Sequence, residues 1–409
     1  MSSANAGWPI VSLSEVTERI MVGIASAATH AYRPSGVPLI RNQNIKPGAL
    51  DDRDLLYVDP GYERAFKNKR LREGDLLTVR TGYPGTTCVV PAAFEGAQSF
   101  TTLISRPQRA KVDSRFLSHY INSELGQSFF TQSQIGGAQK NVNAGVLRGM
   151  PLPLPPTEEQ RAVGAVLDSA DSLIGTLERM VAKKHDIKQG LMQELLTGRT
   201  RLAGFDGEWS TVTVGQLGSF LKGRGIKRDD VRPSGIPCVR YGELYTTYVD
   251  YTASTVSFVR PAVAATALPI RMGDILFAGS GETKEEIGMS VAYTGEKPAV
   301  AGGDIIVLRG TGYNPVFLAS LLNSPEVAAQ KARGGQGDAV VHINWRFLAD
   351  IKVTVPQLPE QRAIAEIFQD ADAEIAIFER QLKSARSIKT GMTQELLTGR
   401  TRLHVEGGS

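Results

Sequence analysis

The stretch QELLTGRTRL occupies residues 193–202, and the same ten letters return at residues 394–403, an offset of 201 positions. At that offset, the tetrapeptide EQRA at 159–162 also returns at 360–363. A gapless alignment of residues 155–202 with 356–403 gives 23 identities in 48 positions. The chain therefore contains an internal repeat. This repeat, rather than any local motif, is the first indicator of the domain organisation.

The remainder of each half repeats more weakly. Trp8 matches Trp209 and Asn143 matches Asn344 at the offset of 201, and the tetrapeptide RPSG at 33–36 matches 232–235 at an offset of 199. A period this long indicates two whole domains rather than a stacked array of short units. We predict four segments: a variable domain at 1–154, a matched segment at 155–202, a second variable domain at 203–355, and a second matched segment at 356–409.

Each matched segment has the features of one long helix. Thr157 and Gln160 have capping-box spacing at the start of the first. Pro359 fits the first turn of the second, where its missing N–H is not needed. Gly198 and Gly399 follow the last apolar residues, as left-handed C-caps do.

Both predicted helices carry an apolar stripe with three- and four-residue spacing, which is typical of a coiled coil. The first stripe comprises Val163, Val166, Ala170, Leu173, Leu177, Met180, Lys184, Ile187 and Leu191. The second comprises Ile364, Ile367, Ala371, Ile375, Phe378, Leu382, Ala385 and Met392. A helix of about 37 residues is roughly 55 Å long, so each stripe needs a long partner. The other stripe is the evident one, and packing of each helix on its own domain is the alternative.

Composition restricts the class of protein. The chain has 409 residues, 42% of them hydrophobic and 22% charged, with a net charge of only +4, which excludes disordered and fibrous classes. Residues 1–154 hold 17 basic against 12 acidic side chains, so one segment is basic. No signal peptide or membrane span is indicated, and we expect a cytoplasmic protein. Cys88 and Cys238 are too isolated to indicate a disulfide framework or a zinc site.

The two variable domains are predicted to be mixed α/β. Short β-type runs alternate with glycine, proline and asparagine, and a helical stretch follows in each domain, at 114–133 and 315–331. Three polar loops fall at matching places with different residues. They are 41–44 against 240–243, 80–83 against 279–284, and 136–143 against 333–344.

The side chains in these loops are of the kind that bind phosphates and base edges. Arginine and lysine donate to guanine, and asparagine and glutamine pair with adenine. Polar residues also populate loops without any function, which is the plain alternative for each single residue. Loops that lie at matching positions but carry different residues favour two domains that share one backbone framework and recognise different sequences.

Motifs for catalysis are weak. The stretch Gly279–Lys284 lacks the ending of a phosphate-binding loop. The sequence NPVF at 314–317 departs from the amino-methyltransferase motif at its third residue. The five histidines have no metal-ligand spacing. We therefore expect no catalytic residues and no metal site in this chain.

The signature PLPLPPTEEQR at 151–161, the helix ending GLMQELLTGRTRL at 190–202 and their second copies resemble the specificity subunit of type I restriction-modification systems. The resemblance covers essentially the whole chain. It implies two α/β target-recognition domains and an antiparallel two-helix coiled coil with a pseudo-twofold repeat. In that family each recognition domain reads one half of a split, asymmetric DNA target.

The resemblance also implies partners: double-stranded DNA, two adenine methyltransferase subunits that dock on the helices, and restriction subunits that translocate DNA. Adenosylmethionine, ATP and magnesium would then belong to those partner subunits. By analogy, we expect nine loop residues near DNA: Arg41, Asn42, Gln43, Lys140, Asn141, Arg240, Tyr241, Lys284 and Gln336. A two-domain protein scaffold without DNA specificity is the alternative, although it would favour apolar rather than polar loops.

Overall fold

The computed structural model describes residues 7–26, 28–133 and 141–403. The chain forms two compact units. Unit 1 comprises residues 1–179 and 380–409, and unit 2 comprises residues 180–379. Each unit holds one α/β domain and one segment of each long helix, so both helices pass from one unit to the other.

Domain 1, the α/β part of unit 1, contains two four-stranded sheets. The first has the order β2 (Thr17–Val22), β11 (Leu103–Pro107), β8 (Leu76–Thr78) and β9 (Thr87–Val89), with all neighbours antiparallel. The second has the order β10 (Gln98–Ser99), β4 (Val37–Ile40), β7 (Leu56–Val58) and β3 (Tyr32–Arg33). Two short pairs complete the domain: β1 (Ile10–Ser12) with β12 (Pro151–Pro153), and β5 (Ile45–Lys46) with β6 (Ala49–Leu50).

The helices of domain 1 are short. They are α1 (Pro60–Glu63), α2 (Ser114–Asn122), α3 (Glu124–Ser133) and α4 (Ala144–Arg148). The single helical stretch expected at 114–133 is thus broken at Ser123, whose hydroxyl donates to the Tyr120 carbonyl at 2.7 Å and stops the first helix.

Domain 2, the α/β part of unit 2, repeats this plan. Its first sheet has the order β14 (Gly218–Lys222), β23 (Ile305–Gly310), β19 (Ile275–Ala278), β21 (Ser290–Tyr293) and β16 (Tyr251–Thr252). Its second has the order β17 (Ser257–Val259), β15 (Ile236–Val239), β22 (Ala299–Ala301) and β18 (Leu268–Ile270). The short pairs are β13 (Ser210–Thr213) with β25 (Lys352–Val355), and β20 (Ser280–Gly281) with β24 (Val341–His342).

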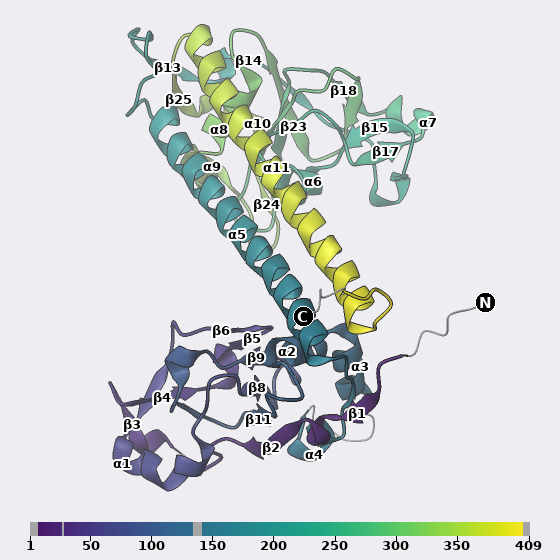
Figure 1. The fold of residues 1–409 in the computed structure, drawn as a ribbon. Coiled ribbons are helices and arrows are strands. Elements are labelled where there is room, and N and C mark those ends of the chain that lie inside the picture. Colours follow the sequence, from purple (N-terminus) through teal and green to yellow (C-terminus); the bar gives the residue numbers. More distant parts are fainter. Residues whose placement is uncertain (1–6, 27, 134–140, 404–409) are drawn as a thin grey trace, which may run out of the picture. The chain divides into compact units, whose positions relative to one another are not determined.

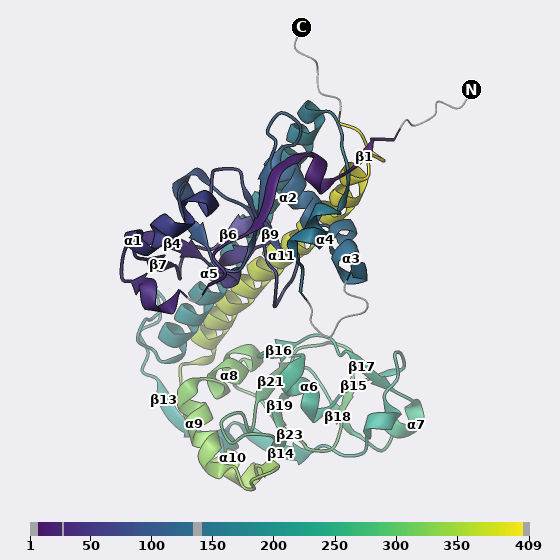
Figure 2. The same cartoon turned by 90° about the horizontal axis from the view of Figure 1, so that it is seen from below.

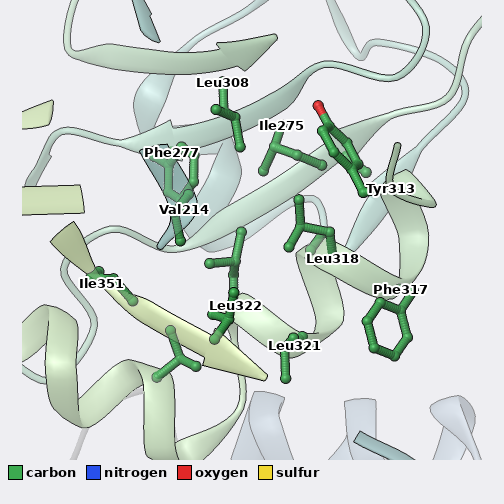
Figure 3. Close-up of a cluster of buried hydrophobic side chains, with 14 of the residues drawn as sticks. Val214, Ile275, Phe277, Leu308, Tyr313, Phe317, Leu318, Leu321, Leu322 and Ile351 are labelled. Carbon is green, nitrogen blue, oxygen red and sulfur yellow. The ribbon is translucent and has the colours of Figure 1, made fainter. Parts of the chain in front are cut away.

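The core of unit 2 lies between the first sheet and helix α8. The helices here are α6 (Tyr241–Thr246), α7 (Pro261–Ala264), α8 (Pro315–Leu322), α9 (Pro325–Gly334) and α10 (Trp345–Asp350). Figure 3 shows Leu318 and Leu322 of α8 facing Ile275 and Phe277 of β19, and all four side chains are fully buried. Such apolar burial stabilises a domain by roughly 25 cal/mol per Å² removed from water.

The two long helices are α5 (Thr157–Leu196) and α11 (Leu358–Leu397), each of 40 residues. In unit 2, the first part of α11 lies beside the last part of α5 (Figure 1). In unit 1, the last turns of α11 lie beside α2 and α3 (Figure 2). The expected glycine caps are confirmed, because Gly198 and Gly399 have φ of 66° and 71°.

The capping box expected from Thr157 and Gln160 is wrong. The Gln160 amide is fully buried and instead joins the helix to the domain before it. Its Oε1 accepts from the Asp113 N–H at 2.8 Å, and its Nε2 donates to the Pro155 carbonyl at 2.7 Å. Gln361 makes the matching bonds in unit 2, to Asn314 N and the Pro356 carbonyl.

Candidate nucleic-acid interface

The first polar loop of domain 1 is a single 3-10 turn, Asn42–Asn44, that follows β4. Buried Asn44 closes the turn, because its Oδ1 accepts from the Arg41 N–H at 3.0 Å. The Arg41 guanidinium lies 3.1 Å from the Asp54 carboxylate, and the Gln43 amide donates to the same carboxylate at 2.8 Å. One acidic side chain therefore positions two of the residues expected near DNA.

Thr81 joins the second loop of domain 1 to the first and the third. Its backbone forms an antiparallel bridge with Asn141, and its hydroxyl lies 3.3 Å from the Asn42 amide nitrogen. The structure thus brings Asn42 and Asn141 to one place. Lys140, which was also expected there, lies outside the described residues.

Some of the buried polar atoms of domain 1 that lack a hydrogen-bond partner belong to residues at or next to this junction, and others, such as Gln98 Oε1, lie elsewhere. Within the described part of domain 1, Nε of Arg41, Oδ1 of Asn42, Nε of Arg80 and Oδ1 of Asn141 accept or donate no hydrogen bond. Buried polar groups in folded proteins are nearly always paired, and an unpaired one costs about 1–3 kcal/mol. These four atoms are themselves buried, so they are unpaired inside the fold rather than displayed to solvent.

A hollow of about 530 Å³ opens beside the same loops. Its wall is largely apolar and includes Val79 and Tyr83, and Tyr83 is 85% exposed. The other lining residues are Asn42, Gln43, Ile45, Lys46, Pro47, Thr81, Gly82 and Thr86. Domain 1 thus presents an aromatic ring and aliphatic surface beside these polar loops.

The first loop of domain 2 has the same frame with other side chains. Glu243 takes the place of Asn44, and its carboxylate accepts from the Arg240 N–H at 3.1 Å and from the Arg240 Nε at 2.8 Å. Glu243 is buried, whereas Tyr241 is 42% exposed. Arg240 is therefore neutralised within the loop, and Tyr241 is presented to solvent.

The second and third loops of domain 2 meet through Ser280 and His342. These residues pair across β20 and β24, and the Ser280 hydroxyl lies 2.9 Å from Nδ1 of His342. Gln336 exchanges two backbone hydrogen bonds with His342, at 2.8 and 2.9 Å. Lys284 lies on the exposed part of the second loop. The structure thus brings Gln336 to the junction.

The two junctions occupy equivalent positions in the repeat. Thr81 and Ser280 are 199 positions apart, Asn141 and His342 are 201 apart, and in each domain the two residues are paired. The frame is therefore shared, while the side chains displayed by it differ.

A buried lysine supports the second loop of domain 2. Nζ of Lys331, on α9, donates to the Gly288 carbonyl at 2.7 Å and lies 3.4 Å from the Ser290 hydroxyl. Burial lowers the pKa of Lys331 to about 7, and the nearby Asp250 carboxylate opposes that shift. The matching residue of domain 1 is Phe130, which lies against Gly85.

Ion pairs join the two long helices within each unit. In unit 1, Asp171 pairs with Lys389, and Glu178 pairs with Arg386 at 2.7 Å. In unit 2, Lys184 pairs with Glu374 and Lys188 with Asp372, both at 2.6 Å. Positions that advance along α5 pair with positions that recede along α11, so the segments run antiparallel in each unit.

The observed seam differs from the expected apolar stripe near the middle of α5. Leu173, Met180 and Ile187 are 54%, 36% and 45% exposed, while charged Lys184 and Lys188 occupy the helix-facing positions through their ion pairs. The reason is that lysine can place its aliphatic stem along a seam and its amine on an acid.

The other expected stripe residues are buried or half-buried, and both alternatives for the stripes hold in part. Val163, Leu177 and Ile364 are buried, and Val166, Leu191, Ile367, Phe378, Leu382 and Met392 are half-buried. The ends of the helices enter the domain cores: Val163 with Leu396 and Leu397 in unit 1, and Ile364 with Leu195 and Leu196 in unit 2. The helices therefore pack on the domains at their ends and on each other between them.

Residues of the repeated motifs form the same interaction in each unit. In unit 1, Arg402 binds the buried Glu159 carboxylate through two contacts of 2.7 Å and lies 5.2 Å from the Trp8 ring centroid. In unit 2, Arg201 binds Glu360 at 2.7 and 2.8 Å and lies over Trp209. The end of one helix is thus tied to the start of the other. We call each set, Trp8–Glu159–Arg402 and Trp209–Glu360–Arg201, a helix-end latch.

Comparison with known proteins agrees with this architecture. The model of the type I restriction modification DNA specificity domain matches residues 5–188 and again residues 206–385. The chain belongs to this family. It carries the specificity domain twice, and each copy includes an α/β domain and most of the helix that follows it.

Curated relatives match over most of the length of this family member. The putative type I restriction enzyme MjaX specificity subunit of Methanocaldococcus jannaschii is 24% identical over 419 aligned positions, covering 97% of this chain and 94% of the relative. The MjaVIII specificity subunit of the same organism is 22% identical over 74% of each chain. Among solved structures, the type I restriction-modification S subunit from M. genitalium superposes with a TM-score of 0.60 at 15% identity, over 97% of each chain.

The described residues lack two features of other classes of protein, a cluster of metal ligands and a membrane-spanning helix. Among them, no group of three or more histidine, cysteine or acidic side chains is arranged to hold a metal ion. None of their helices combines the length and the apolar character that crossing a bilayer requires.

Sequence reasoning missed several residues that the structure places at the site. Arg80 follows a buried strand, and His342 was one of five scattered histidines, so neither had a signal beyond its place in a matching loop. The helix-end latch had a signal, because Glu159, Arg201, Glu360 and Arg402 are all invariant between the two repeats.

Proposed function

We propose that this chain is the DNA-reading subunit of a type I restriction-modification complex and is itself non-catalytic. Domain 1 reads one half of a bipartite, asymmetric target, and domain 2 reads the other half. The observation that carries this proposal is the pair of equivalent loop junctions, Thr81–Asn141 and Ser280–His342, which share a frame and differ in side chains. Direct reading of bases requires just such variable donors and acceptors on a rigid support.

We further propose that α5 and α11 set the spacing between the two half-sequences. The ion pairs of each unit fix the register of one helix against the other, and the helix-end latches fix each end to a domain. A spacer of this kind converts helix length into distance along the duplex, at 1.5 Å per helical residue.

The exposed apolar residues of the helices are the proposed docking surface for two adenine methyltransferase subunits. Leu173 and Ile187 lie 14 positions apart on α5, and Ile388, the repeat equivalent of Ile187, is 58% exposed on α11. Adenosylmethionine would be bound by those subunits, and ATP with magnesium by restriction subunits that complete the complex. Partner subunits would also supply phosphate contacts that a chain of net charge +4 lacks.

The test is a domain exchange in the assembled complex. The chain is purified with its methyltransferase subunits, bound duplexes are selected from a random pool, and their sequences define the target. Replacing residues 1–154 by the matching domain of another family member should change one half-sequence only. A complex that selects no sequence would favour the scaffold alternative, and turnover by the isolated chain with adenosylmethionine, ATP and magnesium would contradict the non-catalytic assignment.

A further inference from the structure

The loop after β14 in domain 2 is strongly basic. Residues 222–232 read KGRGIKRDDVR and hold five basic and two acidic side chains. The corresponding residues 22–33 of domain 1 hold one basic side chain, Arg33, which matches Arg232. Four cations are therefore present in domain 2 only: Lys222, Arg224, Lys227 and Arg228. We call residues 222–228 the cationic loop.

The arginine that both domains share has a structural role, whereas the four added cations are free. Nη1 of Arg232 donates to two carbonyls of its own loop, both at 2.8 Å, and Arg33 makes the matching bonds in domain 1. Elsewhere in domain 2, Arg240 and Arg309 pair with acids. The four cations of the cationic loop are exposed, and within the described part of domain 2 their side chains form neither an ion pair nor a hydrogen bond.

The backbone of the cationic loop is held from within the domain. The Gly223 N–H donates to the Ile305 carbonyl at 2.8 Å. Ile226 is buried in a small core with Cys238, although its φ of 23° is unusual for a β-branched residue. Such a conformation persists only where the surrounding structure determines it. The Lys227 N–H donates to the carboxylate of Asp230 at 2.7 Å and so closes the turn that follows. The exposed cations therefore extend from a fixed backbone.

The cationic loop lies at the same end of the first sheet as the second polar loop of domain 2. Lys222, the last residue of β14, pairs with Ile306 of β23. Ala278, the last residue of β19, pairs with Ile305 on the other side of β23. Neighbouring strands are about 4.8 Å apart, so these two strand ends are separated by about 10 Å. The cationic loop and the polar loop 279–284 therefore leave the sheet side by side, one on each side of β23.

The composition of the cationic loop indicates the kind of ligand. Its one apolar side chain other than glycine, Ile226, is buried, and it contains no aromatic residue that could stack on a base. It therefore displays positive charge without the amides or apolar groups that distinguish one base from another. The phosphates of a DNA duplex carry a regular row of negative charges, and lysine and arginine bind them independently of sequence.

We propose that the cationic loop binds phosphates of the DNA backbone at the half-target of domain 2 and anchors that domain without reading bases. This inference rests on the proposed function and deepens it. Because the corresponding loop of domain 1 lacks the four cations, the two domains bind the duplex unequally. Domain 2 supplies a salt-dependent share of the affinity that this part of domain 1 does not.

The experiment measures the salt dependence of DNA binding by the methyltransferase-bound complex. Duplex selection first defines both half-targets, and the affinity for the selected duplex is then measured over a range of salt concentrations. Each phosphate contact that is lost makes the slope of log affinity against log salt shallower by about 0.9. In K227Q/R228Q the slope should therefore be shallower by about 1 to 2, and binding at about 0.1 M salt should be weaker by about tenfold or more. The selected half-sequences should stay the same.

Altered DNA locates the contact. Uncharged methylphosphonate linkages replace single phosphates in and beside the domain 2 half-target. For the wild-type chain, at least one replacement should weaken binding, because it removes a charge that the cationic loop binds. In K227Q/R228Q the same replacement should have little further effect, since the protein side of the contact is already absent.

Two control variants separate this contact from a general effect of charge. K227R/R228K keeps both charges and should retain the wild-type slope. R271Q/K297Q also removes one arginine and one lysine, both of them exposed. Arg271 precedes β19 and Lys297 follows β21, so they lie at the opposite end of the same sheet, and this variant should also retain the wild-type slope. All four positions are exposed, so the thermal unfolding midpoints should stay near that of the wild type.

Three results would overturn the inference: an unchanged salt slope in K227Q/R228Q, equal sensitivity of wild type and K227Q/R228Q to every methylphosphonate, or a changed half-sequence for domain 2. Weaker assembly with the methyltransferase subunits at an unchanged slope would assign the cationic loop to a protein partner instead. The proposed function would survive each of these results. It would fail if the wild-type complex selected no sequence.

Discussion

Arg402 and Glu159 lie 243 positions apart in the chain and form a two-contact ion pair with both distances at 2.7 Å. The Glu159 side chain is buried and the Arg402 side chain is 44% exposed. The Glu159 carboxylate raises the pKa of Arg402 through these hydrogen bonds. The same arrangement joins Arg201 to Glu360 in unit 2. The helix-end latch is therefore the interaction that the repeated EQR and LLTGRTR motifs form in the folded chain.

Removing Arg402 should destabilise unit 1. In R402A the Glu159 carboxylate would stay buried without its partner, and the free energy of unfolding should fall by about 1–3 kcal/mol. Denaturant unfolding measures this change. R386A is the control, because the Arg386–Glu178 pair is exposed on both sides and should contribute less than about 1 kcal/mol. Equal losses in the two variants would show that the latch is no more than a surface ion pair.

Leucines at the end of each helix should stabilise the domain that they enter. L397A would open a cavity in the core of unit 1, and L196A would do so in unit 2. Each change should cost about 2–5 kcal/mol. Hydrogen exchange with peptide resolution should show faster exchange in domain 1 for L397A and in domain 2 for L196A. Loosening of both domains by either change would contradict the separate cores.

Lys331 should make stability depend on pH above neutrality. The folded-state pKa is about 7, below the ordinary lysine value of 10.5, so the unfolded chain holds a proton that the folded chain has lost between those values. The contribution of Lys331 to stability should therefore rise as pH increases from about 7 to 10 and be constant below 7.

The variant K331M tests this expectation. The difference in unfolding midpoint, wild type minus K331M, should grow between pH 7 and pH 9.5. K352M replaces an exposed lysine of β25 and should show no such trend. A difference that is flat with pH would mean that Lys331 titrates as an ordinary lysine in the folded chain.

Lengthening both helices together should change the target spacing. Insertion of one heptad after Arg179 and one before Arg380 keeps the ion pairs of each unit in register. Seven residues add about 10.5 Å, which is about three base pairs at 3.4 Å each. Duplex selection should then return the same two half-sequences with about three more base pairs between them. Altered half-sequences would contradict the role of the helices as a spacer.

The fold could be predicted largely from the repeat. Identity between residues 155–202 and 356–403 located both long helices, and the glycine caps at 198 and 399 located their ends to within a few residues. The register of the helices could not be predicted from apolar spacing alone. Lys184 and Lys188 lie on the seam because specific acids face them, and Leu173 and Ile187 lie outside it.

The candidate site was predictable in position but not in detail. Matching loops indicated the three segments, and the structure brings Asn42 to Asn141 and Gln336 to His342. The loop sequence does not reveal which cations are neutralised. Arg41 and Arg240 are tied to acids, and the pairing of Arg41 depends on Asp54, which lies many residues away.

The entry of Leu396 and Leu397 into the core of unit 1 has a consequence for biosynthesis. The ribosome synthesises all of domain 2 before it reaches these leucines. The core of domain 1 therefore stays incomplete until the end of the second long helix has been synthesised. A chain truncated after domain 2 would lack Leu396 and Leu397. Its domain 1 would then have an incomplete core and would be prone to proteolysis.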